Sequence, residues 1–292
     1  MTRTVRTLSF LMLDRHVRVT CRDDHWADIV RANYAALLSP RCERPADLEF
    51  MIEGHALSRR HVLHQRGRCS VAERRASQLL FRLEKAVTVS LQELRSDLLF
   101  FHAAALTHEG RVILLVGESG HGKSTTAWGL LHHGFEYLSD ELGPVELPSL
   151  QVHSYAHALC MKRLPPAGYA LPATGAMDLG ATLHVPVDAM PASVGVPSTL
   201  GAVVFVRHDR TLSAPAWRAV GAAEASARLY AQALNALAHP AKGVDAVVDV
   251  ATRVPCYALD TADLRLSCEL LRDQVWRWEP RHRPAESPRL AA

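Results

Sequence analysis

An eight-residue pattern near the middle of the chain limits the folds that this sequence can adopt. Residues 117–124 read GESGHGKS and satisfy G-x-x-x-x-G-K-[ST] at every fixed position. An unbroken apolar run, residues 112–116, precedes the pattern, as expected for a strand buried on both faces. Residues 123–133 follow as an amphipathic helix, and Gly134 stands where that helix would end. Strand, glycine-rich loop and helix together predict an α/β fold with a phosphate-binding loop, the P-loop.

The residue types of this loop suit a polyphosphate. Glycines let successive backbone amides point inward, and the start of the helix adds the positive end of its dipole. Lys123 can reach the β and γ phosphates, and the Ser124 hydroxyl is suited to hold Mg²⁺. The residues expected to contact the nucleotide are Gly117, Glu118, Ser119, Gly120, His121, Gly122, Lys123, Ser124 and Thr125.

A pair of acids follows the predicted helix. Residues 135–142 read FEYLSDEL, a short β-prone run that contains Asp140 and Glu141. A strand that returns parallel to the first would carry these carboxylates to the same edge of the sheet, beside the phosphates. One carboxylate could hold Mg²⁺, and the other could take a proton from an attacking hydroxyl.

Composition excludes several classes of protein. The chain has 292 residues, 48% of them hydrophobic, and a formal charge of +3 with no run of five like charges. Nucleic acid is therefore not an expected partner. The first apolar stretch, residues 8–13, is too short for a membrane span or a secretory signal, so we expect a cytoplasmic protein without a membrane partner. Cysteines and histidines show no metal-ligand spacing.

Hydrophobic periodicity divides the chain into three parts. Residues 1–98 read as a small α+β domain, residues 99–278 as the P-loop catalytic domain, and residues 279–292 as a disordered, Pro- and Arg-rich tail. The N-terminal domain could recognise a leader peptide, mediate homo-oligomer formation or simply cover the sheet. The expected strands are 7–13, 17–21, 47–54, 100–106, 111–116, 200–206 and 254–260, and the expected helices besides 123–133 are 26–38, 73–94, 222–238 and 261–275, the last capped by Asp260.

Residues 165–199 are rich in Pro, Gly and Ala and have weak periodicity. This composition predicts a long surface loop or lid, with disorder as the alternative.

The motifs taken together resemble the HPr kinase/phosphorylase superfamily, whose P-loop fold is related to that of phosphoenolpyruvate carboxykinases. The shared pattern is a histidine at the head of a strand, here His102, then the apolar strand, the loop with its S-G-x-G core, a helix ending in Gly, and an acidic pair. The resemblance covers about residues 101–142. It implies an α/β P-loop kinase core of the HPr kinase/phosphoenolpyruvate carboxykinase type, here with a small N-terminal α+β domain.

The resemblance also implies roles for individual residues. Lys123 and the loop amides would hold the phosphates of ATP, and Ser124 with Asp140 or Glu141 would hold Mg²⁺. Asp140 would be the base on the acceptor hydroxyl, and His102 a nearby phosphate-facing or proton-managing residue, although a histidine taken alone is more often a core residue.

Three basic residues are weaker candidates for a role at the site. Arg207, in FVRHD, resembles a strand end that supplies an arginine in these proteins. Lys162 and Arg163, in CMKRLPP, are further candidates.

Two departures from the family pattern bear on the substrate. The acidic pair is Asp-Glu where the bacterial HPr enzymes usually carry Asp-Asp, and no glycine-rich segment of the kind used to recognise HPr follows it. The chain is more similar to compact HPr-kinase-like proteins of peptide natural-product pathways, including kinases that phosphorylate a serine of a lasso precursor peptide.

We therefore expect an ATP- and Mg²⁺-dependent kinase that acts on a serine hydroxyl of a peptide or small protein, with a ribosomal natural-product precursor as one candidate. Two alternatives stay open. The acceptor could be a small metabolite with a hydroxyl, or the chain could be a regulatory protein that binds a nucleotide without useful turnover.

Overall fold

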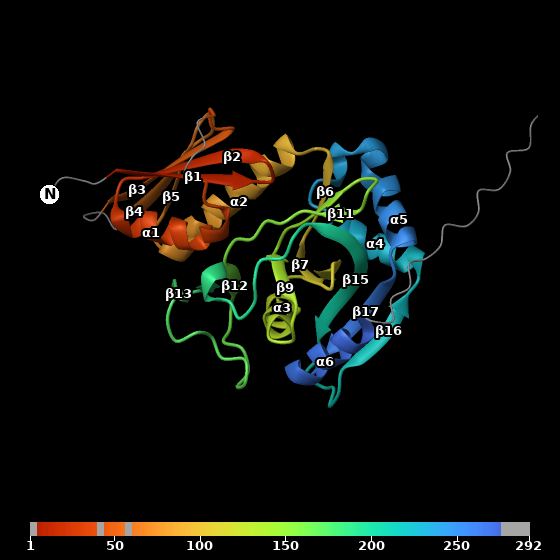
Figure 1. Ribbon diagram of the computed structural model, residues 1–292. Helices are drawn as coiled ribbons and strands as arrows, with labels where there is room; N and C mark the ends of the chain where they lie inside the picture. Colours follow the sequence, from red (N-terminus) through yellow and green to blue (C-terminus); the bar gives the residue numbers. More distant parts are fainter. Residues whose placement is uncertain (1–4, 40–43, 56–59, 276–292) are drawn as a thin grey trace, which may run out of the picture.

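Three β-sheets and six α-helices make up the part of the chain that the computed structural model describes, residues 5–39, 44–55 and 60–275 (Figure 1). The strands are β1 (Arg6–Met12), β2 (Arg15–Cys21), β3 (Leu48–His55), β4 (Arg60–Gln65), β5 (Val71–Glu73), β6 (Leu98–Phe101), β7 (Ala103–His108), β8 (Arg111–Val116), β9 (Glu136–Ser139), β10 (Gly143–Glu146), β11 (Gln151–Val152), β12 (Leu159–Met161), β13 (Met177–Asp178), β14 (Leu183–Val185), β15 (Ser198–His208), β16 (Ala216–Val220) and β17 (Cys256–Thr261). The helices are α1 (Asp24–Asn33), α2 (Ala76–Leu94), α3 (Lys123–Leu131), α4 (Ala222–Gln232), α5 (Val244–Arg253) and α6 (Leu264–Val275).

The N-terminal sheet has the order β1-β2-β3-β4-β5, with β2 and β3 parallel and the other neighbours antiparallel. α1 and α2 pack on one face of it, where apolar residues of the strands meet the helices. Leu142 and Tyr155, which come from the chain after β9, belong to the same apolar cluster as Leu80 of α2. The hydrophobic core of the N-terminal unit therefore includes residues from the rest of the protein.

The second sheet has nine strands, in the order β6-β10-β11-β15-β8-β7-β9, with β17 against β15 and β16 against β17. Alternate residues of its central strands face opposite sides. Ile113 and Leu115 of β8 pack with α3 and α6, whereas Val112 and Leu114 pack with α4 and α5. Helices thus cover both faces of the sheet (Figure 1), and the predicted mixed α/β architecture is confirmed.

Strand β8 leads into the P-loop and α3, as predicted. β7 pairs antiparallel with both β8 and β9, so β9 runs in the same direction as β8 with β7 between them. The expected parallel return is therefore correct in direction, although the two strands are not neighbours. The helix ends at Leu131, two residues before the predicted end, and Gly134 takes a positive φ of 87° in the turn that follows.

The predicted N-terminal elements are present with shifted ends. The helix expected over 26–38 is the shorter α1, because Asp23 caps its start by accepting a hydrogen bond from the Trp26 backbone N–H (2.8 Å) and the chain leaves the helix at Tyr34. The helix expected over 73–94 starts later, as α2, because β5 takes its first residue. Strand β4 was not expected from the sequence.

The strand expected over 100–106 is in fact two strands. β6 ends at Phe101 and β7 starts at Ala103, because the chain passes from one partner strand, β10, to another, β8. The backbone N–H of His102 donates to the carbonyl of Gln232 at this corner (2.8 Å). His102 therefore lies at a break in the sheet and not within a strand.

The segment expected to be a long loop or lid, residues 165–199, contains regular structure. β13 and β14 lie within it and join β12 in a three-stranded sheet. Its last residues already belong to β15, which continues to His208, beyond the predicted end at Val206.

The C-terminal helices also differ from the predicted ones. The helix expected over 222–238 ends at Gln232 as α4, and the Leu234 backbone N–H then bonds to the carbonyl of Phe100 (2.7 Å). α5 was not expected from the sequence.

The predicted cap of the last helix was wrong. α6 begins at Leu264, and Asp263 accepts a hydrogen bond from the Leu266 backbone N–H (2.9 Å). Asp260 instead lies in β17 and pairs with Arg207. The predicted tail, 279–292, lies outside the described residues.

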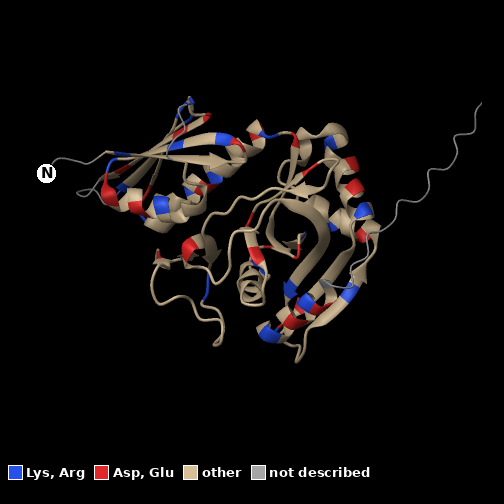
Figure 2. Ribbon diagram, viewed as in Figure 1, with Lys and Arg blue, Asp and Glu red and all other residues tan. Residues whose placement is uncertain are grey.

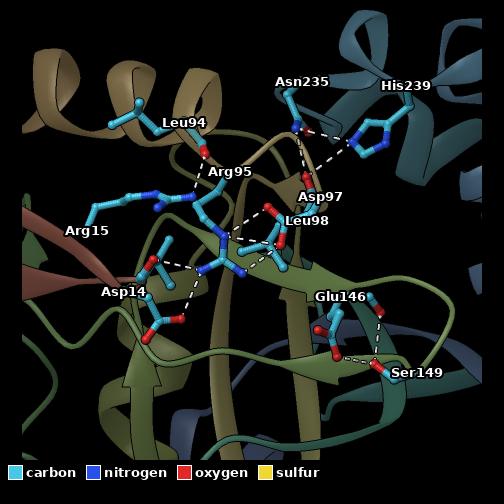
Figure 3. Close-up of polar contacts among 11 residues, drawn as sticks. Asp14, Arg15, Leu94, Arg95, Asp97, Leu98, Glu146, Ser149, Asn235 and His239 are labelled. Atoms are coloured by element: carbon cyan, nitrogen blue, oxygen red, sulfur yellow. Dashed lines mark hydrogen bonds and ion pairs between the residues drawn. The ribbon is translucent and has the colours of Figure 1, made fainter. Parts of the chain in front are cut away.

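Arg95, just after α2, fastens the end of that helix to the turn between β1 and β2, close to the junction with the rest of the chain (Figure 3). Its guanidinium donates to both carboxylate oxygens of Asp97, to the carbonyl of Leu13 (2.7 Å) and to Asp14 (3.2 Å). Only 8% of its side chain is exposed. On the other side of the junction, Asn235 donates to the carbonyl of Leu98 (2.8 Å).

Replacing Arg95 by Ala is expected to lower the free energy of unfolding by about 1–3 kcal/mol, because several charge-assisted hydrogen bonds are lost and the Leu13 carbonyl loses a donor. The control is Arg66→Ala, which removes an ion pair to Glu49 from a side chain that is 81% exposed and should cost less than about 1 kcal/mol. Urea unfolding of both variants measures the difference. Equal losses of unfolding free energy in the two variants would contradict the anchoring role of Arg95.

None of the described helices is both long and apolar enough to cross a lipid bilayer. Basic and acidic residues are interspersed over both parts of the chain (Figure 2).

Candidate functional site

The site lies where several strand ends meet. β8 and β15 run parallel, with Val116 paired to Phe205, so the P-loop leaves the sheet beside the end of β15. Ala103, the first residue of β7, pairs with Val116, which brings the corner at His102 to the same edge. Asp140 follows β9 directly and reaches this edge as well.

Close packing and backbone conformation explain two of the loop glycines. A Cβ on Gly117 would lie 2.6 Å from the carbonyl oxygen of Val206 in β15, so no side chain fits there. Gly122 precedes α3 with φ of 93°, a conformation that L side chains rarely adopt. No side chain caps α3, so its first amides stay available for a phosphate.

Lys123 folds back over its own loop. Its ammonium donates to the carbonyls of Gly117 (2.7 Å) and Glu118 (3.3 Å), and the residue is 6% exposed. Burial lowers the pKa of Lys123, while Asp140 and Glu141 act in the opposite direction. Such an ammonium lies close to where the β and γ phosphates of a bound nucleotide would lie.

Asp140 is the most unusual ionisable group of the site. It is fully buried, and its Oδ2 accepts a hydrogen bond from the Ser124 hydroxyl (2.9 Å). Its other oxygen, Oδ1, is buried without a hydrogen-bond partner among the described residues. Burial, and then the nearby charge of Glu141, raise the pKa of Asp140 to about 7. A carboxylate with a pKa near the working pH is suited to take and release a proton.

These groups fit Mg²⁺ bound together with a nucleotide. Ser124 and Asp140 offer a hydroxyl and a carboxylate that already touch, and the unpartnered Oδ1 is the kind of hard oxygen that Mg²⁺ prefers. In the described part of the chain, no group of three or more His, Cys, Asp or Glu side chains could hold a metal. Phosphate oxygens and water would have to complete the shell, which is usual for Mg²⁺.

Glu141 and His102 lie on the wall of one cavity with Asp140. Glu141 is exposed and has a positive φ of 70°. The ring of His102 hydrogen-bonds to the side-chain oxygen of Gln232 (3.3 Å). Burial, followed by the charge of Lys123, lowers the pKa of His102, so the ring is neutral near pH 7.

The cavity has a volume of about 170 Å³ and lies between α2 and the edge that carries the acidic pair. Its lining residues are Phe81, Glu84, Lys85, Thr88, His102, Asp140, Glu141, Leu142, Tyr155, His157 and Leu234.

Sequence reasoning missed Glu84. Burial raises its pKa to about 7, although the charge of His157 opposes the shift. Glu84 lies on α2 at the spacing of the buried residues Leu80, Val87 and Leu91. A carboxylate in that apolar stripe was the signal that could have identified it.

A polar network connects Glu84 to the rest of the structure. Asn33 of α1 donates to Glu84 (3.0 Å), and its own side-chain oxygen bonds to the ring of His184 in β14 (3.2 Å). The Ala158 backbone N–H donates to the carbonyl of Asn33 (2.7 Å), and the neighbouring His157 bonds to the carbonyl of Asp140 (2.8 Å).

The basic candidates are placed differently. Lys162 donates to Ser119 of the P-loop (2.7 Å), and both Lys162 and the neighbouring Arg163 are exposed. Arg207 bonds to Asp260 (2.8 Å) and is 59% exposed.

His208, at the same strand end, hydrogen-bonds to the P-loop. Its backbone N–H donates to the carbonyl of His121 (3.1 Å).

No family model matches the chain, and a search of curated proteins finds no match either. Among solved structures, the chain is similar to the HPr(Ser) kinase/phosphatase from Coxiella burnetii. The similarity covers 61% of this chain and 97% of that one, with a TM-score of 0.32 and 16% sequence identity.

Proposed function

We propose that this chain is an ATP- and Mg²⁺-dependent kinase, with a P-loop core of the HPr kinase type, that transfers the γ-phosphoryl group to a serine hydroxyl on a peptide or small protein. The observation that carries the proposal is the contact between Ser124 of the P-loop and the buried carboxylate of Asp140, which also lines a cavity. A protein that only binds a nucleotide needs the loop, but it does not need a carboxylate poised near neutral pH beside it.

The proposed reaction uses Asp140 as the base. As the acceptor oxygen bonds to the γ-phosphorus, its proton passes to the Asp140 carboxylate, and the bond between the γ-phosphorus and the β–γ bridging oxygen breaks to release ADP. Lys123 and the loop amides hold the phosphates. Ser124, with Asp140 or Glu141, would hold Mg²⁺, which when bound neutralises phosphate charge. Neutral His102 adds no further positive charge beside Lys123.

Transfer from radiolabelled ATP tests this proposal. We expect label in serine-containing peptides in the presence of Mg²⁺ and no transfer when EDTA is added. The panel includes precursor peptides of ribosomal natural products, which are the acceptors that we propose first. ATP binding without acceptor-dependent release of ADP, across the whole panel, would contradict the kinase assignment.

A small hydroxyl-bearing metabolite is the second candidate acceptor, and the size of the cavity favours it. A volume of about 170 Å³ is below the roughly 300–1,000 Å³ of pockets that enclose a drug-sized ligand. It accommodates one side chain or one small molecule, so free alcohols belong in the same assay.

A further inference from the structure

The cavity beside Asp140 has walls from both parts of the chain. Helix α2 of the N-terminal unit supplies Phe81 and Glu84, and the P-loop half supplies His102 and Asp140. A ligand in this cavity therefore touches the N-terminal unit and the proposed base at the same time.

Three buried polar atoms on the lining residues lack hydrogen-bond partners within the described part of the chain. They are Oδ1 of Asp140, the hydroxyl of Tyr155 and Nδ1 of His157, on residues that are 0%, 1% and 5% exposed. Unpaired buried polar atoms are rare in folded proteins, because each costs about 1–3 kcal/mol. Three of them around one cavity indicate that a polar ligand completes the site.

The lining has more acidic than basic side chains. It contains three carboxyl groups, those of Glu84, Asp140 and Glu141. It contains one ammonium group, that of the exposed Lys85. Glu84 accepts a hydrogen bond from Asn33 at Oε1, whereas its Oε2 accepts none from the described residues. That oxygen is free to accept a bond from a ligand.

Two large apolar residues of the lining are also exposed to solvent. Phe81 of α2 is 55% exposed, and Leu234, after α4, is 46% exposed. Exposed apolar side chains in the lining favour an occupant that continues beyond the small cavity, as a peptide does and a small alcohol does not.

We propose that this cavity is the acceptor site and that Glu84 determines specificity by binding a cationic group next to the reacting hydroxyl. The occupant is a peptide segment with Lys or Arg adjacent to its serine. The inference rests on the proposed kinase function for the identity of the reacting group, whereas the binding site itself stands on the cavity and its charge.

Peptide binding tests the site separately from the chemistry. Fluorescent peptides with Lys, norleucine or Glu next to serine are titrated against the full chain with Mg²⁺ and a non-hydrolysable ATP analogue. Norleucine keeps the apolar stem of lysine and removes the charge. We expect the Lys peptide to bind about tenfold more tightly than the norleucine peptide, and the Glu peptide to bind most weakly.

Glu84→Gln should reduce the preference for Lys to less than about twofold, because the amide can still accept from Asn33 but carries no charge. The control is Glu93→Gln on the same helix, where Glu93 pairs with Arg68 and is 57% exposed. The Glu93→Gln variant should keep the full preference for the Lys peptide. The unfolding temperatures of both variants show whether Glu84→Gln is folded. If Glu84→Gln binds every peptide more weakly by the same factor, Glu84 has a structural role and the inference is overturned.

The remaining outcomes separate the possibilities. Equal binding of Lys and norleucine peptides by the wild type, or an unchanged preference in Glu84→Gln, would overturn the inference. If the Lys peptide binds selectively but no phosphoryl transfer occurs when ATP replaces the analogue, the binding site is supported and the kinase function is contradicted. If ethanolamine is phosphorylated and displaces the Lys peptide at equal concentration, the occupant is a free amino alcohol and the peptide assignment is overturned.

Discussion

Replacing Asp140 by Asn should reduce the rate of phosphoryl transfer by about 10²–10⁴-fold, which is the usual contribution of a general base. Asparagine keeps the size of the side chain and can still accept the hydrogen bond from Ser124. It cannot take a proton from the acceptor. The measurement is kcat/KM with the best peptide of the panel, and transfer at the wild-type rate would exclude Asp140 as the base.

Magnesium titration separates the base from a metal ligand. If Asp140 acts as the base, the Asp140→Asn variant should lose turnover while its half-saturating Mg²⁺ concentration stays near that of the wild type. Glu141→Gln is the matched control on the neighbouring residue. A large rise in the Mg²⁺ requirement of one variant identifies that residue as the main metal ligand.

The raised pKa of Asp140 predicts the pH dependence of catalysis. With a pKa of about 7 in the free enzyme, the fraction of Asp140 in the carboxylate form rises about tenfold per pH unit as the pH is raised toward 7. We therefore expect kcat/KM to rise with that slope and to level off above about pH 8. A profile that is flat between pH 5 and 8 would contradict this assignment.

The same pKa predicts the stability of the nucleotide-free protein. Since the pKa is about 7 in the folded state and 3.8 in an unperturbed side chain, the folded state holds a proton that the unfolded chain releases between those values. Ionisation therefore destabilises the fold as pH rises from about 4 to 7. Asp140→Asn should unfold at a higher temperature than the wild type at pH 8 and at a similar temperature near pH 4. Lost activity in a more stable protein cannot be attributed to misfolding.

Lys123→Ala has the second large expected effect, a loss of about 10²–10³-fold in transfer, because it removes a buried cation from the phosphate site. Binding of a fluorescent ATP analogue should weaken as well. Lys162→Ala is the control, since Lys162 also contacts the P-loop, through Ser119, but is exposed. Its effect should be smaller, and equal losses in both variants would contradict the special role of Lys123.

The parts of the site that could be predicted from the sequence depend on neighbours along the chain. The strand, glycine loop and helix around Lys123 follow from a continuous pattern, and the arrival of Asp140 at the same edge follows from the direction of β9. Neither conclusion requires knowledge of which strand lies between β8 and β9. The break in the strand at His102 could not be predicted without the strand order, because one apolar run pairs first with β10 and then with β8.

Glu84 could not be found in the same way. Nothing near it in the chain shows that α2 passes beside Asp140, more than fifty residues later. The three-stranded sheet within residues 159–185 was missed for a related reason. Its strands have two or three residues each, too few for a visible alternation, and they are specified by their pairing with one another.

The shared hydrophobic core has a consequence for how such a protein can diversify. Leu142 and Tyr155 line the cavity and also pack with the residues that hold α2 in place. The N-terminal unit is thus not a detachable module. Exchanging it for that of another protein would expose these side chains and remove one wall of the cavity, so a change of acceptor is more readily made by single substitutions along α2 than by recombination of whole domains.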